Sequence, residues 1–555
     1  MDNKIKNLLL TFLSIVVLFS SCKKKLEEYN PSGLTASTVY TNAAGFETLV
    51  NAAYSYSRFW YGKEEGYSIS EMGTDIWTNG SGDVFPQLST YNNLQGSNTA
   101  ALTLEWNSFY AAINLCNKGI KGISEVSDYT PLQKSTREAE LRYLRAFYYW
   151  HIVETWGGVH FTTEPTDGVI TTANKTPVDT FYNQIFADLQ FAVSNLPTTT
   201  PLQYGRVWQP VAKAFLARMY LTRGKNAEAI AMANDVIKNY GFSLLPKYGD
   251  LWNMANLKNK EVVWSIDYST NLANNDLASS TYPSGHGRGS NSGHLLFLMV
   301  YDQVNLTILL RDINNGRPFN RYMPTLSLLN MFNETIDSRY DGSFQTVWLT
   351  NKAGTSGGNN FAIGDTAAYT AKTTIPASVM NGKKYTTYDV SKTYGSNGVP
   401  SQRKFYPSLK KFKDSTRTSV AEAQSARDVF VIRLAEMYMI AAEAEMNIGK
   451  LDSAAYYINV VRTRAALPGK VADMQITAGQ VTLDFILDER AREFAGEQLR
   501  WFDLKRTGKI ESRIGTLNPD ASGFVKPFHL VRPIPQSQID AVSNKDTFKQ
   551  NPFYL

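Results

Sequence analysis

The chain has 555 residues, of which 43% are hydrophobic, so it is long enough to bury one large core or several smaller ones. Its net charge of +6 is small for this length, which argues against the dense basic surface that nucleic-acid binding needs. The 31 tyrosines, 28 phenylalanines and 10 tryptophans exceed the needs of a core alone, and this favours a ligand surface built on aromatic rings.

The N-terminus has the features of a bacterial lipoprotein signal. Lys4 and Lys6 form a basic start, and the apolar run over residues 8–19 is shorter than the roughly 20 residues that a membrane span needs. Cys22 follows two serines, an arrangement in which the thiol receives a diacylglycerol and anchors the protein. We therefore predict that Cys22 is lipidated; an ordinary signal peptide with an incidental cysteine is the alternative. The predicted boundaries are residues 1–21 for the signal peptide and 22–40 for the lipidated tether.

Cys116 is the second of only two cysteines. With Cys22 lipidated, no disulfide can form within the chain, so the fold has to be stabilised by its core. Because Cys116 lies in an apolar stretch, we expect it to be a small buried hydrophobic side chain.

Helical periodicity begins soon after the tether. Apolar residues recur at spacings of three and four, which is typical of amphipathic helices. The predicted helices include residues 46–53, 102–120, 141–152 and 181–196. Gly157 and Gly158 end the third of these helices, and Pro197 ends the fourth.

Two later segments resemble each other. Residues 211–237 and 436–462 align at a constant offset, which matches Gly224 with Gly449 and places a Lys after each glycine. Each segment has the pattern of a helix, a tight Gly-Lys turn and a second helix, in which the glycine adopts the left-handed conformation that ends the first helix. The two copies predict a degenerate pair of tetratricopeptide-like helical hairpins.

Between the two copies the composition changes to Gly, Ser, Asn, Thr and Tyr, and helical stripes become rare. Irregular segments of this length are usually functional or disordered. The predicted fold is therefore mainly α, with a tetratricopeptide-like helical-hairpin scaffold and a large irregular loop-rich insertion. The predicted regions are an N-terminal helical region over 41–264, the insertion over 265–428 and a C-terminal helical region over 429–555.

A series of motifs runs through the mature chain in a fixed order. They are Phe46 to Tyr54, Trp106 to Asn114, Glu140 to Trp150, Trp156-Gly157-Gly158, Ala212 to Leu221, Arg433 to Ala444, Glu489 to Glu493, Arg500 to Arg506, Pro533 to Pro535 and Asn551 to Phe553. Behind a lipoprotein signal, this ordered set resembles the SusD/RagB family of outer-membrane lipoproteins of Bacteroidota.

The resemblance implies a role. Members of that family sit over a SusC-type TonB-dependent transporter, capture oligosaccharides or, in some branches, peptides, and act as a lid on the barrel. It implies attachment to the outer membrane through the lipid, with the protein facing the cell exterior. Members often carry acidic residues after the cysteine, whereas Lys23 to Lys25 follow Cys22 here, so the inner face of that membrane is the alternative.

No motif predicts catalysis, a cofactor or a metal. Glu489, Glu493 and Glu497 share one helix face, and their interleaved arginines favour structural ion pairs over a catalytic acid and base. The five histidines lack the spacing of a zinc-protease helix, and the Gly-rich loop over 285–289 does not fit a dinucleotide site. We therefore expect a non-enzymatic binding protein; an anchored glycoside hydrolase or an adaptor that binds only proteins are the alternatives.

Sugar capture needs aromatic rings that stack on apolar sugar faces, together with amides and carboxylates that bind hydroxyls. Two Gly-broken segments alternate rings with such polar groups. The predicted ligand-binding residues are Tyr67, Asp75, Trp77, Asn79 and Asp83 in the first segment, and Tyr282, Arg288 and Trp348 in the insertion. Trp77 is the strongest candidate, because Asp75 and Asn79 flank it. The alternative for Trp348 is that it anchors a loop onto the core.

Overall fold

The structure is a computed structural model, and it describes residues 39–166, 168–269, 271 and 291–555. The predicted signal peptide, the lipidation site Cys22 and most of the tether lie outside the described residues, as do Tyr282 and Arg288. The fold is mainly α-helical, as predicted. Within the described part of the chain, no helix has both the length and the apolar character that crossing a bilayer requires.

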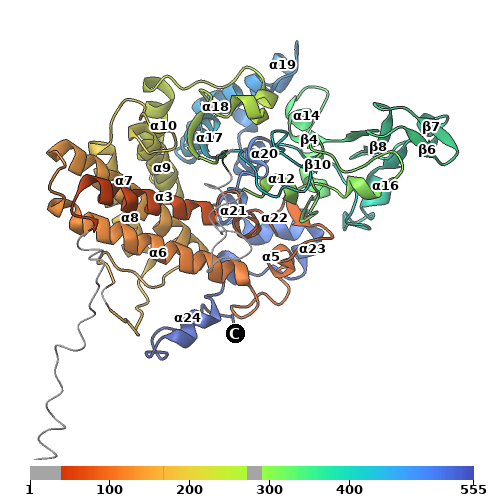
Figure 1. Cartoon of the computed structure of the whole chain (residues 1–555). Coiled ribbons are helices and arrows are strands. Elements are labelled where there is room, and N and C mark those ends of the chain that lie inside the picture. The colour runs from red at the N-terminus through yellow and green to blue at the C-terminus, as the bar shows by residue number, and fades with distance from the viewer. Residues whose placement is uncertain (1–38, 167, 270, 272–290) are drawn as a thin grey trace, which may run out of the picture.

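Four long helices form one half of the molecule (Figure 1). They are α3 (Ala43–Ser55), α6 (Ala100–Gly122), α7 (Pro131–Trp156) and α8 (Val178–Asn195), and consecutive members pack against each other. The centre of this half is α7, which is buried on every side from Tyr143 to Trp156. Thr130 and Gln133 form a capping box at its start, and Gly157 ends it with a φ of 73°. Cys116 is fully buried in α6, as predicted.

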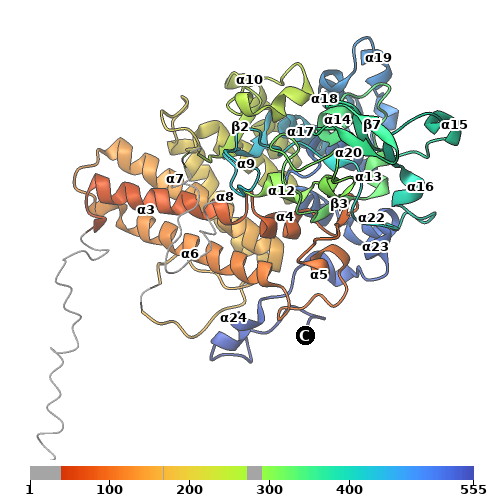
Figure 2. The same ribbon diagram turned by 45° about the vertical axis from the view of Figure 1, so that its right-hand side comes forward.

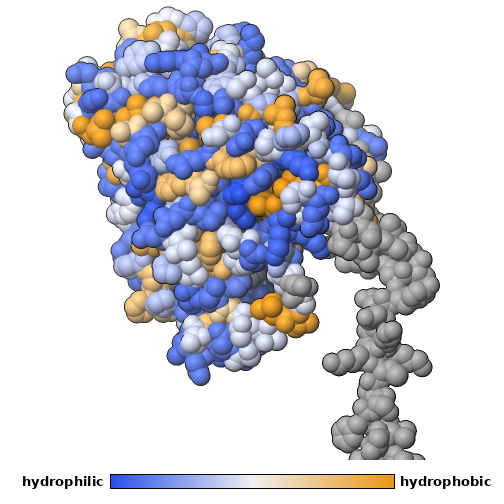
Figure 3. Space-filling view, turned by 90° about the vertical axis from the view of Figure 1, so that its left-hand side faces the viewer, coloured by the Kyte–Doolittle hydropathy of each residue, from blue (hydrophilic) through white to orange (hydrophobic). Residues whose placement is uncertain are grey.

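The two predicted hairpins are present and lie side by side. The first is α9 (Gln209–Thr222) with α10 (Asn226–Asn239), and the second is α17 (Leu434–Asn447) with α18 (Leu451–Ala465). Gly224 and Gly449 have φ values of 69° and 79° at the turns. The first hairpin packs through α10 against α17, so two segments far apart in sequence form one continuous helical stack (Figure 2). On the face shown in Figure 3, hydrophobic residues form separate patches among hydrophilic ones.

Short elements occupy the other half of the molecule. Before the first hairpin they are α4 (Glu64–Ser70), β1 (Trp77–Asn79) and α5 (Pro86–Thr90). Between the hairpins they are β2 (Val262–Ile266), α12 (Gly293–Leu296), β3 (Tyr322–Pro324), α13 (Leu326–Asn330), α14 (Arg339–Ser343), β4 (Phe344–Gln345), β5 (Val347–Leu349), β6 (Gly354–Ser356), β7 (Asn359–Phe361), β8 (Thr366–Thr370), α15 (Ala377–Met380), β9 (Thr386–Tyr388), α16 (Val390–Thr393), β10 (Ser408–Leu409) and β11 (Val429–Arg433).

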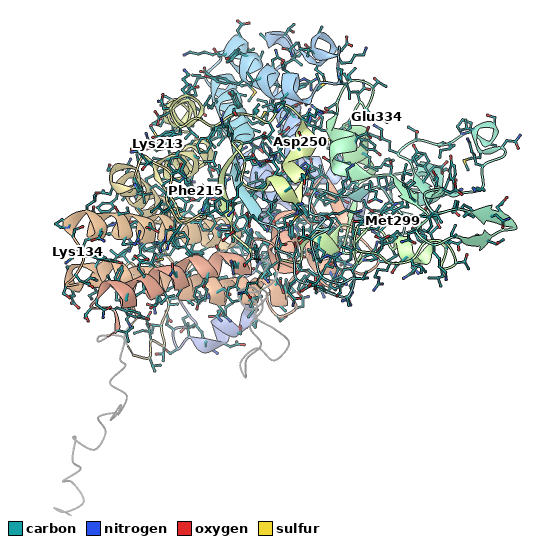
Figure 4. All side chains as sticks on the ribbon, turned by 45° about the horizontal axis from the view of Figure 1, so that its top comes forward. Lys134, Lys213, Phe215, Asp250, Met299 and Glu334 are labelled. Atoms are coloured by element: carbon teal, nitrogen blue, oxygen red, sulfur yellow. The ribbon has the colours of Figure 1, made fainter. Side chains whose placement is uncertain are left out.

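These short strands form small sheets, not one large sheet. Among the described strands, β5, β8 and β9 form the only sheet of three, and β6 and β7 form a hairpin beside it at one end of the molecule (Figure 1). The segment predicted as a loop-rich insertion nevertheless contributes most of a second core, which is built around Phe297, Tyr322 and Trp348 and also includes Trp77. Figure 4 places Phe215 in the helical half and Met299 in this second core.

The C-terminal segment joins the two halves. Its helices are α19 (Val471–Met474), α20 (Leu483–Phe494), α21 (Arg500–Arg506), α22 (Ile510–Leu517), α23 (Pro519–Ser522) and α24 (Gln536–Ala541). The carboxylates predicted to make structural ion pairs do so. Glu489 pairs with Arg339 at 2.8 Å and with Arg492 at 2.7 Å, and Glu497 pairs with Lys411 at 2.9 Å.

Candidate functional site

Three of the aromatic residues predicted to bind ligand lie in the core. Tyr67, Trp77 and Trp348 are 1%, 0% and 0% exposed. The Trp77 ring packs edge-on against Phe297 with 4.9 Å between centroids, and Trp348 stacks on Tyr301 at 4.6 Å. A ring that stacks on a sugar has to expose one face. The structure therefore corrects the expectation for these three side chains, and Trp348 takes the alternative role of anchoring its strand to the core.

Asp75 is also buried and is engaged in ion pairs. Its carboxylate lies 2.6 Å from Arg500 and 2.8 Å from Arg513. Burial alone would raise the pKa of Asp75, but the two guanidinium groups hold it below its usual value. Both arginines follow more than 400 positions later in the chain, so Asp75 ties the first segment to the C-terminal helices. It is a structural carboxylate, not a ligand contact.

Asn79 and Asp83 are the two predicted residues that remain partly accessible. Asn79 is the last residue of β1, which pairs antiparallel with β3, and Asp83 follows in the next loop. The intervening backbone continues along residues 319–321, with Gly80 N–H donating to the Arg321 carbonyl at 2.7 Å and Gly82 N–H donating to the Asn320 carbonyl at 2.9 Å. A Cβ added at Gly80 would stand 2.2 Å from a backbone oxygen, so this close approach requires glycine.

An aromatic ring with cationic neighbours lies on the facing segment. Phe319 is half-buried, and the guanidinium carbons of Arg317 and Arg321 lie 5.2 and 5.1 Å from its ring centroid. Arg403 donates to the Asn79 side-chain oxygen at 2.9 Å and pairs with Asp520 at 2.7 Å. We refer to Asn79, Asp83, Phe319, Arg321 and Arg403 as the β1–β3 rim.

Burial opposes the charged form of the rim carboxyl group Asp83 and of the neighbouring Glu64. Burial raises the pKa of Asp83, although its carboxylate accepts hydrogen bonds from the Ser89 hydroxyl at 2.6 Å and from the Phe85 N–H at 2.9 Å. Burial also raises the pKa of Glu64 to about 7, against the opposing effect of Arg321 at 2.6 Å. The rim thus combines one ring, an amide, guanidinium donors and carboxyl acceptors on a shallow surface.

Phe319, Arg321 and Arg403 were not among the residues predicted from the sequence. The run from Gly316 to Arg321 contains a glycine, a ring, an asparagine and two arginines, which is the same composition that selected the segment around Trp77. Composition does not predict the pairing of β1 with β3, which brings residues 80–82 alongside residues 320–321.

A metal site does not emerge from the described residues, because they contain no cluster of three or more His, Cys, Asp or Glu side chains suited to an ion. His151 and His294 are buried, and burial lowers the pKa of each to about 3. His286 lies outside the described residues.

Solved structures share the fold. The protein described as a laminarin binding SusD-like protein superposes with a TM-score of 0.71 at 23% identity, over 92% of this chain and 100% of that one. Surface glycan-binding protein A from Bacteroides thetaiotaomicron, in complex with laminarihexaose, superposes with a TM-score of 0.66 at 20% identity, over 92% and 99% of the two chains.

Sequence comparisons agree with the structural ones. A SusD-like protein of Formosa agariphila is 24% identical over 97% of each chain, and a SusD-like protein of Bacteroides ovatus is 24% identical over 90% of this chain and 82% of its own. A family model described as starch-binding and associating with the outer membrane matches residues 36–221. The model of the SusD family matches residues 260–554. Because that match spans more than half of the sequence, the chain belongs to the SusD family.

Proposed function

We propose that this protein captures an oligosaccharide at the β1–β3 rim without cleaving it and delivers it to a SusC-type TonB-dependent transporter. The observation that carries the proposal is the half-buried Phe319 ring, which lies on the segment that runs alongside residues 80–82 and has two guanidinium groups near it. A ring supports the apolar face of a sugar, and the surrounding amide, guanidinium and carboxyl groups match its hydroxyls. The laminarin and laminarihexaose named for two proteins of the same fold support a glycan as the ligand.

The membrane part of the proposal rests on the N-terminal sequence. Cys22 carries the lipid, residues 22–40 form the tether, and the protein stands at the outer membrane facing the cell exterior. Co-purification of a SusC-type barrel from cells that carry Cys22, and not from cells that carry Cys22→Ser, tests the anchor and the partner together.

The binding proposal is tested by calorimetry with laminarihexaose, cellohexaose, maltohexaose and xylohexaose. Phe319→Ala should weaken binding of the recognised hexaose about threefold to tenfold, because a stacked ring contributes roughly 0.5–1.5 kcal/mol beyond buried area. Tyr456→Ala is the matched control, since Tyr456 is 63% exposed on α18 and is not part of the rim. An unchanged dissociation constant for Phe319→Ala would remove the rim from the site, and release of shorter sugars by the wild-type protein would support the hydrolase alternative.

A further inference from the structure

One hollow of the described surface is lined by residues 200–208, 240–242 and 258–265. It has a volume of about 440 Å³, and a second hollow of about 370 Å³ adjoins it. Both are lined by the segment Gln203–Arg206 and by Ser265, so this segment forms a wall that the two share. We refer to the pair as the Tyr204 groove. None of its lining residues belongs to the β1–β3 rim.

Aromatic rings line the first hollow. Trp208, at the start of α9, packs against Tyr240 at 5.9 Å and against Phe242 at 5.8 Å between centroids. All three side chains are only half-buried, so they keep some contact with solvent. Tyr204 is 37% exposed in the shared wall. A cavity of a few hundred Å³ with several rings has the size and character of a small-molecule site.

Tyr204 is fixed in place by its neighbours. The Ser265 hydroxyl donates to the Tyr204 phenol oxygen at 2.7 Å, and the Trp264 indole N–H donates to the Gly205 carbonyl at 3.0 Å. Gly205 has a φ of 84°, a conformation in which glycine carries no steric penalty. Lys258 Nζ lies 4.2 Å from the Tyr204 ring centroid. A ring ordered before the ligand arrives loses less conformational freedom on binding.

The Arg206 guanidinium at the groove is compensated within the protein, and Lys258 and Lys260 add positive charge to the lining of the first hollow. Arg206 pairs with Glu47 at 2.6 Å and with Glu140 at 2.8 Å, and it also donates to the Asn51 side chain at 3.0 Å. The first hollow also presents two amide side chains near its rings, Gln203 from the shared wall and Asn259. Rings combined with amides and hydroxyls suit a polyhydroxylated ligand, and the lysine ammonium groups can donate further hydrogen bonds to its hydroxyls.

From this arrangement we infer that the Tyr204 groove is a second binding site for an oligosaccharide chain, which crosses the Tyr204 wall and occupies both hollows. The inference rests on the proposed function for its ligand class, but not on the β1–β3 rim. Two separate sites on one chain would hold a polymer more tightly than either alone, because the second contact is made at high effective concentration.

The test is calorimetry with the same four hexaoses on full-length protein. The wild type should bind two molecules of the recognised hexaose per chain. In a Phe319→Ala background one binding event should remain, and adding Tyr204→Ala should weaken that event about threefold to tenfold. Tyr204→Phe keeps the ring and should retain most of the affinity, and Tyr456→Ala is the matched exposed-tyrosine control. Thermal unfolding confirms that each variant is folded.

The outcomes separate the two sites. Binding in the Phe319→Ala background that Tyr204→Ala leaves unchanged would overturn the groove while leaving the glycan function intact. Binding that responds to Tyr204→Ala and not to Phe319→Ala would support the groove and overturn the rim. A wild-type protein that binds a hydrophobic peptide in the groove and none of the hexaoses would overturn both.

Discussion

Glu71 shows how burial controls the charge of a single carboxyl group in this protein. The side chain is fully buried; its Oε1 accepts the Leu499 N–H at 3.0 Å, and its Oε2 has no hydrogen-bond partner among the described residues. Burial raises the pKa of Glu71 to about 8, although the backbone N–H groups of Leu499 and Arg500 act in the opposite direction. The neutral acid is therefore the native form near pH 7.

Titration of Glu71 should make native stability fall as pH rises. The unfolded chain loses this proton near pH 4.5 and the native protein near pH 8, so between these values unfolding releases a proton and each pH unit costs about 1.4 kcal/mol. Glu71→Gln mimics the neutral form, so its stability relative to wild type should improve from about pH 5 to about pH 8. Urea unfolding at both pH values measures this difference. The exposed Glu125→Gln should show no such trend, and equal trends in both variants would contradict the assignment.

At the scale of elements, the two hairpin turns should respond alike to substitution. Gly224 and Gly449 both have positive φ, and a Cβ at either position would meet nothing within 4 Å. Alanine there should therefore cost only the conformational penalty, about 1–2 kcal/mol at each turn. Gly515 lies inside α22 with equally open space, and alanine there should stabilise by roughly 0.5–1 kcal/mol. Urea midpoints that fell in all three variants would show that contacts, not backbone conformation, set these effects.

The hairpins were predictable because their signal is local. A glycine after a helical stripe specifies the turn, and the recurrence of the pattern at Gly449 marks the second copy. The ion pairs of α20 were predictable for a related reason, because Glu489 and Glu493 share a face with arginines interleaved between them. What the sequence did not indicate is that α10 packs on α17, since that contact joins segments separated by the whole second core.

The candidate site was predictable in composition but not in orientation. Trp77 and Asn79 occupy the same short strand, yet Trp77 points into the second core and Asn79 reaches the rim. Residues two apart in a strand share a face, so the difference comes from position: Phe297, more than 200 positions later in the chain, covers Trp77, whereas Asn79 is the last residue of β1. The residues around Trp77 in the sequence do not show which distant residues will pack against it. For this reason the prediction placed Trp77 and Trp348 at the surface, whereas the structure buries both rings.

The whole molecule is held together by a buried ion network between its two halves. Arg433, at the end of β11, pairs with Glu261 at 2.7 Å, with Glu493 at 3.1 Å and with Glu497 at 2.7 Å. Arg464 of α18 pairs with Glu261 at 2.8 Å, which connects the helical stack to the same group. Of these two arginines, Arg433 is the one that pairs with three carboxylates, so its removal should disturb the network most.

Removing Arg433 should therefore destabilise the whole fold. Arg433→Ala leaves three carboxylates buried without one of their cations, and breaking a buried pair in this way costs about 3–5 kcal/mol. In the wild type burial would raise the pKa of Glu493, but the surrounding arginines hold it well below its usual value, so wild-type stability falls in acid. In Arg433→Ala, Glu493 loses one of the cations that lower its pKa, so protonation of Glu493 costs the variant less than the wild type and the deficit should shrink as pH is lowered towards about 4. Urea unfolding at neutral and acidic pH measures both effects.

Lys121→Ala is the control, because it breaks an exposed pair with Glu164 and should change little. A deficit in Arg433→Ala that is no larger than that control, or that grows in acid, would show that the network does not couple the two halves.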